Sequence, residues 1–248
     1  QTRQVYNRAE SNILTPDLGV VYDFTKNLSA YASYTSIFNP QWARDQAGRL
    51  LDPEEGKTYE LGMKGAWFDN RLNAAVAVFE NRRNNLAVAD GGKTPEGGDS
   101  FAPVDNTKGR GWEAEISGEL VPGWSLQAGY SHAVVRDSDG ERLQTVLPES
   151  TFKLFTTWTP RSFNKLTVGG GMFWRSKAYP DWTEGAMTDG MTIKAYSVVN
   201  LMARYRIDRH LSLAVNLNNL FDRDYRVSLS EHDYGSPRAL RATLRYQF

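Results

Sequence analysis

The chain has 248 residues with 29 basic and 29 acidic side chains, so it lacks the basic surplus that is typical of nucleic-acid-binding proteins. It contains no cysteine, which excludes disulfides, cysteine nucleophiles and thiolate metal sites. No apolar run approaches the roughly 20 residues of a transmembrane helix. A β-barrel exposes only alternate residues to lipid, however, so the polar average composition is compatible with a barrel in a membrane.

Hydropathy alternates with a period of two along almost the whole chain, which predicts β-strands. Trp112, Ala114 and Ile116 share one strand face, for example, while Glu113 and Glu115 share the other. Many predicted strands exceed the about 5–6 residues of an ordinary strand and match the about 9–11 residues of a tilted membrane strand. The eleven predicted strands are 17–24, 28–38, 57–67, 71–89, 107–120, 124–136, 149–159, 165–177, 194–207, 210–228 and 237–248.

Short and long connections alternate between these strands. The short turns are 25–27, 68–71, 121–123, 160–164 and 208–210, and the long connections are 39–56, 90–106, 137–148, 178–193 and 229–236. Short turns at one end and long loops at the other are typical of an outer-membrane barrel. A soluble sandwich has no physical reason to keep this alternation through five hairpins.

Aromatic residues lie at the ends of the predicted strands, on the apolar face, whereas the core of a soluble sandwich would concentrate them in mid-strand. Near the short turns and the last residue they are Trp67, Trp124, Trp158, Tyr205, Tyr246 and Phe248, and near the long connections they are Tyr59, Trp112, Phe152, Trp174 and Tyr225. Such rings predict the two aromatic belts of a membrane barrel. Asn218 and Asn219 interrupt the strand 210–228, which resumes with Phe221 and Tyr225 on the outward face, and a bulge or a barrel-rim adjustment would explain this.

The opposite face carries charges that a dry core would not accommodate, so we expect it to line a polar lumen. Its charged residues are Glu60, Lys64, Glu113, Glu115, Glu119, Lys153, Arg204, Arg206, Arg241 and Arg245. The three histidines are scattered without metal-ligand spacing, and the Glu113–Glu115 pair follows simply from strand alternation. The sequence therefore predicts no catalytic residues, no metal site and no enzyme.

Four segments of the sequence carry a resemblance to a known family: "LSAYASYTSIFNPQ", "LDPEEGKTYELGMKGAWFDNRLNAAVAVFENRRNNLAV", "NLNNLFDRDY" and "YGSPRALRATLRYQF". They resemble the C-terminal half of TonB-dependent outer-membrane receptors, in particular the ferric-siderophore branch. The resemblance implies an all-β fold, an antiparallel up-and-down transmembrane β-barrel of 22 strands around a plug, in which the eleven predicted strands form the C-terminal half. Residues 1–248 would then be the C-terminal portion of the barrel domain, without the plug domain and the N-terminal barrel strands.

The same resemblance implies a function. The protein would lie in the outer membrane of a Gram-negative bacterium, in contact with its lipid, bind a ferric siderophore at its extracellular loops and import it with energy from the TonB complex. The missing N-terminal region would contact TonB, and the outer-membrane assembly machinery would read the terminal strand ending at Phe248. Iron would be chelated cargo, and no cofactor is expected. The alternatives are import of haem, cobalamin or a glycan by the same kind of barrel, and a passive porin.

The long connections hold aromatic residues outside the two predicted belts. A ferric siderophore is large and partly aromatic, so its receptor needs stacking surfaces and a few charges but no direct metal ligands. We expect Trp42, Tyr179 and Trp182 to face the external vestibule, with Arg44 as an anion contact. The alternative explanation for each of these residues is packing between loops. The full candidate set is Trp42, Arg44, Phe101, Tyr179, Trp182 and Tyr234.

Overall fold

The computed structural model describes residues 11, 13–180, 192–229 and 233–248. Eleven long strands follow one another in one antiparallel meander, and each pairs with its neighbours in the chain. They are β1 (Asp17–Thr25), β2 (Leu28–Asn39), β3 (Glu54–Trp67), β4 (Leu72–Asn84), β7 (Thr107–Val121), β8 (Trp124–Arg136), β10 (Ser150–Trp158), β11 (Leu166–Arg175), β12 (Tyr196–Arg206), β13 (Leu211–Asn218) and β14 (Ala239–Tyr246). Every predicted strand is therefore present.

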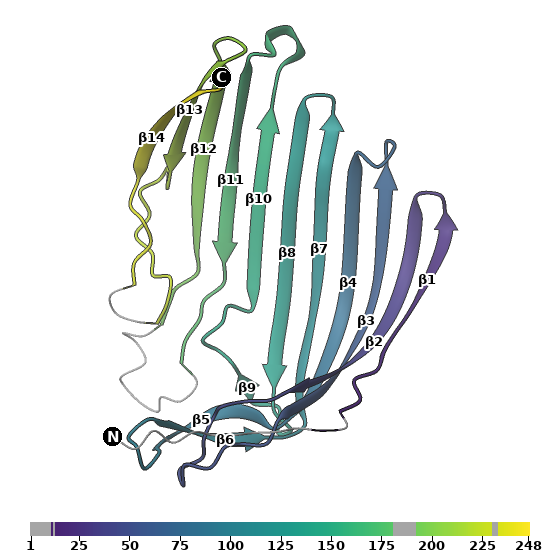
Figure 1. Ribbon diagram of the computed structural model, residues 1–248, viewed down its shortest axis with the longest axis vertical. Coiled ribbons are helices and arrows are strands. Elements are labelled where there is room, and N and C mark those ends of the chain that lie inside the picture. Colours follow the sequence, from purple (N-terminus) through teal and green to yellow (C-terminus); the bar gives the residue numbers. More distant parts are fainter. Residues whose placement is uncertain (1–10, 12, 181–191, 230–232) are drawn as a thin grey trace.

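Figure 1 shows these strands side by side in a curved sheet, with the short turns at the top and the long connections at the bottom. The sheet is open: β1 pairs only with β2, and β14 only with β13, among the described residues. One short helical turn, η1 (Arg161–Phe163), lies in a short connection. Within the described ranges, none of the helical structure has the length and apolar character needed to cross a bilayer.

Two predicted strands end earlier than the hydropathy pattern indicates. The strand predicted to reach residue 89 ends at Asn84, because Asn85 adopts a left-handed backbone conformation with φ of 57°. The chain then forms a separate hairpin, β5 (Leu86–Lys93) and β6 (Asp99–Val104), which lies across the ends of the long strands in Figure 1. The strand predicted to reach residue 228 ends at Asn218, because Asn219 has φ of 50°.

The register of the pairing makes one face of the sheet apolar from strand to strand. Residues directly opposite each other point to the same face. Leu201 lies opposite Gly170 on one side and Leu217 on the other, and Leu217 lies opposite Leu240. The leucine side chains of this outward face are exposed, with Leu240 at 70% and Leu201 at 43% of their maximal exposure. A continuous apolar surface of this kind suits lipid and would be a liability in water.

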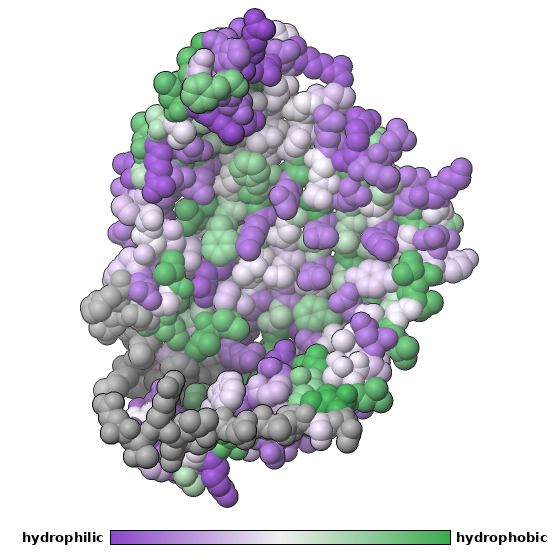
Figure 2. Space-filling view, in the orientation of Figure 1, coloured by the Kyte–Doolittle hydropathy of each residue, from purple (hydrophilic) through white to green (hydrophobic). Residues whose placement is uncertain are grey.

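The other face is polar. Figure 2 shows hydrophilic side chains spread across the middle of the visible face, with no continuous apolar band. The Tyr31 hydroxyl donates a hydrogen bond of 2.6 Å to Glu60 on this face. A compact apolar cluster lies on the same face near the long connections, where Ile193, Tyr196 and Val198 are buried. Phe173, Tyr225 and Leu229 pack against these three residues. The short strand β9 (Arg142–Leu143) pairs with β8 at the end of the sheet that carries the long connections.

Candidate functional site

The first long connection folds into a small hairpin that carries Trp42 and Arg44. Arg44 and Leu50 form a bridge, and Asp45 accepts hydrogen bonds of 2.8 Å from the backbone N–H and the side chain of Arg49. The backbone N–H of Arg49 holds the pKa of Asp45 below its ordinary value, and the Arg49 side chain acts in the same direction. The Arg44 guanidinium donates to the carbonyl oxygen of Gly48. Arg44 therefore stabilises the turn of its own loop.

The β5–β6 hairpin packs against this first connection. The backbone N–H of Phe101 donates to the carbonyl oxygen of Arg44, at 2.8 Å. The carboxylate of Asp90 accepts hydrogen bonds from the buried Ser100 hydroxyl, from the backbone N–H of Gly92 and from the side chain of Gln46. These hydrogen bonds lower the pKa of the Asp90 carboxyl, and the bond from Ser100 has the largest effect. We call residues 40–53 and 86–104 together the first loop unit.

A second loop unit joins residues 137–149 to residues 176–180. The Thr145 hydroxyl donates to the Tyr179 carbonyl oxygen at 2.6 Å, and the Tyr179 backbone N–H donates to the Thr145 carbonyl oxygen at 2.9 Å. Two cations lie near the Tyr179 ring: the Arg142 guanidinium at 5.7 Å and the Lys177 ammonium at 5.4 Å from its centre. Both distances are in the range of cation–π attraction. Arg142 also forms an ion pair with Glu149. The ring of Tyr179 is therefore held in place by charge as well as by backbone pairing.

The third loop unit, residues 219–229 and 233–238, is organised by Asn219, which is 2% exposed. Its amide nitrogen donates to the carbonyl oxygens of Arg223 and Ser236, and its amide oxygen accepts from the Arg223 backbone. Tyr225 is turned away from the outward belt predicted for it and packs on Tyr196 of the polar face, with ring centres 4.7 Å apart. The prediction for Tyr225 is wrong because Asn219 ends the strand and reverses the alternation.

The structure brings three of the six candidate residues together and separates the rest. Trp42, Arg44 and Phe101 belong to the first loop unit, Tyr179 to the second and Tyr234 to the third. Trp42 and Tyr234 are largely exposed, at 68% and 64%, so their rings are accessible to a ligand. Trp182 lies outside the described residues.

Sequence reasoning missed the cations that flank Tyr179. Arg142 lies in a polar loop that shows no strand pattern, and Lys177 was assigned to a strand end. Only the pairing of β9 with β8 and of Tyr179 with Thr145 brings these residues together. Within the described part of the chain, no cluster of three His, Asp or Glu side chains could hold a metal ion. The loop units offer exposed rings and cations, which suit recognition of a large anionic or aromatic ligand.

Comparison with known proteins identifies relatives over nearly the whole chain. A family model described as TonB dependent receptor-like, beta-barrel matches residues 1–220. The chain is 43% identical over 98% of its length to the ferric-pyoverdine 358 receptor of Pseudomonas putida, and covers 30% of that protein. It is 40% identical over 96% of its length to the ferripyoverdine receptor of Pseudomonas aeruginosa, and covers 31% of it.

Solved structures agree with these relatives. The ferripyoverdine receptor of the Pseudomonas aeruginosa outer membrane, bound to ferripyoverdine, matches with a TM-score of 0.83 at 39% identity, over 96% of this chain and 33% of that one. The FpvAI–pyocin S2 complex matches with a TM-score of 0.84 at 39% identity, over 96% of this chain and 34% of that one. The chain thus spans about a third of the length of the relatives it matches.

Proposed function

Since the chain belongs to the family of TonB-dependent receptor β-barrels, we propose that it forms the C-terminal portion of the barrel of a receptor that takes up a ferric siderophore. The family places the chain in the outer membrane, and the apolar outward face of the sheet fits that environment. The observation that carries the proposal is its identity of 43% and 40% to two ferric-pyoverdine receptors over nearly the whole chain, loops included.

A ferric pyoverdine is the first ligand to test. The relatives named above are pyoverdine receptors, and one was solved with ferripyoverdine bound. The loop units support this choice, because Trp42 and Tyr234 expose aromatic surface and the Tyr179 ring lies near two cations. Such a ligand enters with its iron already chelated, so iron is cargo and needs no ligands from the protein.

The proposal extends to two partners of the intact receptor. The TonB complex would supply energy through a region N-terminal to this chain, and the assembly machinery would recognise the last strand, where Tyr246 and Phe248 pack edge to face at 5.2 Å. Members of the family act as receptors and transporters, so we assign the chain a role in uptake and none in catalysis.

Binding and uptake by the intact receptor test this proposal. We expect ferric pyoverdine to quench the tryptophan fluorescence of the purified receptor, and cells that carry the receptor to accumulate radioactive iron from it only when TonB is present. Uptake without TonB would indicate a passive porin. Binding of haem, cobalamin or a glycan in place of any ferric chelate would indicate another nutrient.

A further inference from the structure

The polar face of the sheet, which lines the lumen of the barrel, carries its charges unevenly. On strands β3, β4, β7 and β8 the charged residues of this face are Glu54, Glu60, Glu113, Glu115, Glu119, Lys64 and Arg83. On strands β10 to β14, which contain no acidic residue, they are Lys153, Arg175, Arg204, Arg206, Arg241 and Arg245. One half of the lumen wall is therefore acidic and the other half is basic.

Four arginines of the basic half form a compact group near the short turns, which we call the arginine cluster. Arg204 and Arg206 are two residues apart on β12, about 7 Å along the strand. Ser212 lies opposite Arg206 on one side and Arg245 on the other, so these two arginines are two strand spacings, about 10 Å, apart. Arg241 is four residues before Arg245 on β14, about 14 Å along the strand. All four side chains are exposed.

The protein does not neutralise the arginine cluster itself. In the described part of the chain, none of the ion pairs includes one of its four arginines. The carboxylate of Asp208, in the adjoining turn, accepts hydrogen bonds from the backbone N–H groups of His210 and Leu211. Four like charges at this spacing repel one another. Their positions are therefore stabilised when an anion binds between them.

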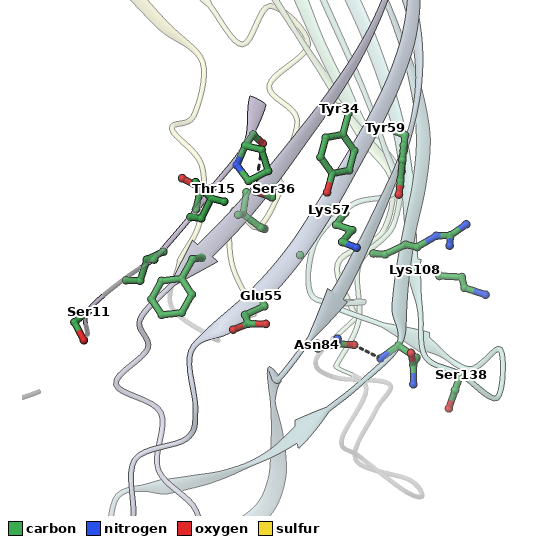
Figure 3. A pocket seen from close by; sticks show the side chains of 18 residues that line it. Ser11, Thr15, Tyr34, Ser36, Glu55, Lys57, Tyr59, Asn84, Lys108 and Ser138 are labelled. Atoms are coloured by element: carbon green, nitrogen blue, oxygen red, sulfur yellow. Dashed lines mark hydrogen bonds between the residues drawn. The ribbon is translucent and has the colours of Figure 1, made fainter. Parts of the chain in front are cut away.

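Cations on the outward face of the sheet are accompanied by carboxylates. Figure 3 shows a groove on that face, at the opposite end of the strands, with a volume of about 1050 Å³. Lys57 and Lys108 line this groove together with Glu55. Arg82 also lines it and forms an ion pair of 2.6 Å with Glu80. The arginine cluster differs from this groove because its cations have no carboxylate beside them on the same strands.

Arg175 lies at the other end of the basic half, beside the loop units. It is 8% exposed, and its Nε and Nη2 atoms are buried without a hydrogen-bond partner among the described residues. Its guanidinium lies 5.9 Å from the centre of the Tyr196 ring. Arg175 is opposite Tyr196, ten residues before Arg206 on β12, so about 34 Å separate the two levels. The basic half therefore has cations at both ends of a span that matches the about 30 Å of a bilayer core.

The wall between these two ends is smooth and uncharged on β11 and β12. Gly169 and Gly171 bring no side chain to the polar face, and they lie opposite Met202 and Asn200. Such a surface leaves room beside the wall and offers no charge that would hold an anion midway. An anionic molecule that moves along this half from the loops next meets unpaired cations at the arginine cluster.

We propose that the arginine cluster is a second binding site for an anionic ferric chelate, occupied when the cargo leaves the receptor at the end of the short turns. Ligand groups must be deprotonated to bind a metal, so a molecule that wraps a ferric ion carries anionic groups. Guanidinium groups bind such groups through charge-assisted hydrogen bonds. A wall of one sign also raises the local concentration of the opposite charge. The inference rests on the proposed uptake of a ferric siderophore.

Binding and uptake by the intact receptor, measured separately, test this site. In the Arg204→Gln/Arg241→Gln/Arg245→Gln variant we expect the affinity of the purified receptor for ferric pyoverdine to stay within about twofold, because the loop units are unchanged. The TonB-dependent uptake rate at saturating ferric pyoverdine, per folded receptor, should fall about tenfold, the lower end of the effect of a charged cleft on local concentration. The variant with lysine at the same three positions keeps the charge and should retain the rate within a fewfold range.

The matched control removes three cations at the same end of the barrel but outside the polar face. Lys26, Arg161 and Arg209 are exposed residues of the short turns. The Lys26→Gln/Arg161→Gln/Arg209→Gln variant should therefore bind and import ferric pyoverdine as the wild type does. A loss of uptake equal to that of the arginine-cluster variant would overturn the proposal, because it would show a general effect of charge at this end.

Three other outcomes would contradict the proposal in distinguishable ways. An undiminished uptake rate in the triple glutamine variant of the arginine cluster would overturn the second site and leave the proposed function intact. Entry of a hydrophilic dye into cells with this variant, without TonB, would overturn the second site by showing that the arginines hold a domain in the lumen. Failure of the wild type to bind any ferric chelate would overturn the proposed function and the second site together.

Discussion

The backbone N–H of Phe101 donates a hydrogen bond to the carbonyl oxygen of Arg44, at 2.8 Å, and so joins two connections that are far apart in the chain. Both residues are candidate ligand contacts on sequence grounds. Their backbone link, together with the bonds of Asp90 to Ser100 and Gln46, makes the first loop unit a single structure that can present Trp42 in a defined position. A ligand that meets a preformed loop unit loses less conformational entropy on binding than one that must order it.

The first prediction concerns pH and the first loop unit. The pKa of Asp90 is lowered in the folded protein, so its bonds stabilise the loop unit fully above the ordinary carboxyl pKa of 3.8, and this contribution is lost as the pH falls through the lower folded value. Hydrogen exchange of residues 40–53 and 86–104 should accelerate over that acidic range. In Asp90→Asn the exchange should already be faster at neutral pH, and this component of the pH dependence should vanish. Identical profiles for the two proteins would contradict the role given to Asp90.

The second prediction concerns ligand contact by Trp42. Its ring is 68% exposed, so Trp42→Ala removes little packing and should leave the melting temperature unchanged. If the ring stacks on the ligand, the affinity for ferric pyoverdine should fall about tenfold, as for a moderate hot-spot residue. Trp67→Ala, at the opposite end of the strands, is the matched control and should not alter binding. Unchanged affinity in Trp42→Ala, measured by titration of the intact receptor, would remove Trp42 from the site.

The third prediction concerns Asn219. Asn219→Ala removes two hydrogen bonds donated by a buried amide and one that it accepts from the Arg223 backbone. Leaving these buried groups unpaired should lower the free energy of unfolding by about 1–3 kcal/mol. The measurement is the urea or heat denaturation of the intact receptor, together with hydrogen exchange of residues 219–229 and 233–238. Asn218→Ala, one position earlier on the strand, should have a smaller effect; equal effects would show that Asn219 does not organise the third loop unit.

The fourth prediction compares the two faces of one strand. Leu201 faces outward in the middle of β12, so Leu201→Arg should destabilise the barrel in lipid by about 2–4 kcal/mol. Met202→Arg places the same charge one residue further on, on the polar face, and should be tolerated. Comparison of the folded fraction in outer-membrane preparations checks this. Equal loss for both variants would contradict the assignment of lipid-facing and lumen-facing sides.

Local alternation in the sequence was sufficient to predict the meander. Apolar and polar residues alternate with a period of two along each strand, which identifies its two faces. The turns within the hairpins are short, so each strand can pair only with its neighbour in the hairpin. That pattern was sufficient to predict all eleven strands and the end of the sheet that carries the long loops. It also predicts the aromatic belts, except for Tyr225. The two strand ends at Asn84 and Asn218 were misjudged because apolar residues continue beyond them, while Asn85 and Asn219 redirect the backbone.

The composition of the candidate site was only partly predictable. Exposed loop aromatics such as Trp42 and Tyr234 can be found from their position outside the belts, but the cations around Tyr179 cannot, because Arg142 and Lys177 come from different connections. Residues that lie opposite each other on neighbouring strands show the same limit. Lys57, Arg82, Lys108 and Arg136 are unremarkable one by one, and only the register of three strand pairs sets them opposite each other.

The sequence by itself determined the strand alternation, the order of short and long connections and the resemblance to TonB-dependent receptors, because these depend on residues close together in the chain. In the strand "RALRATLRYQF", for example, the alternation places Leu240 on the lipid-facing side and Arg241 on the lumen-facing side. The tertiary structure alone decided which loops join, where Tyr225 packs and which cations lie opposite each other. These depend on contacts between distant segments, whose geometry is set by strand register and by single residues that reverse the chain.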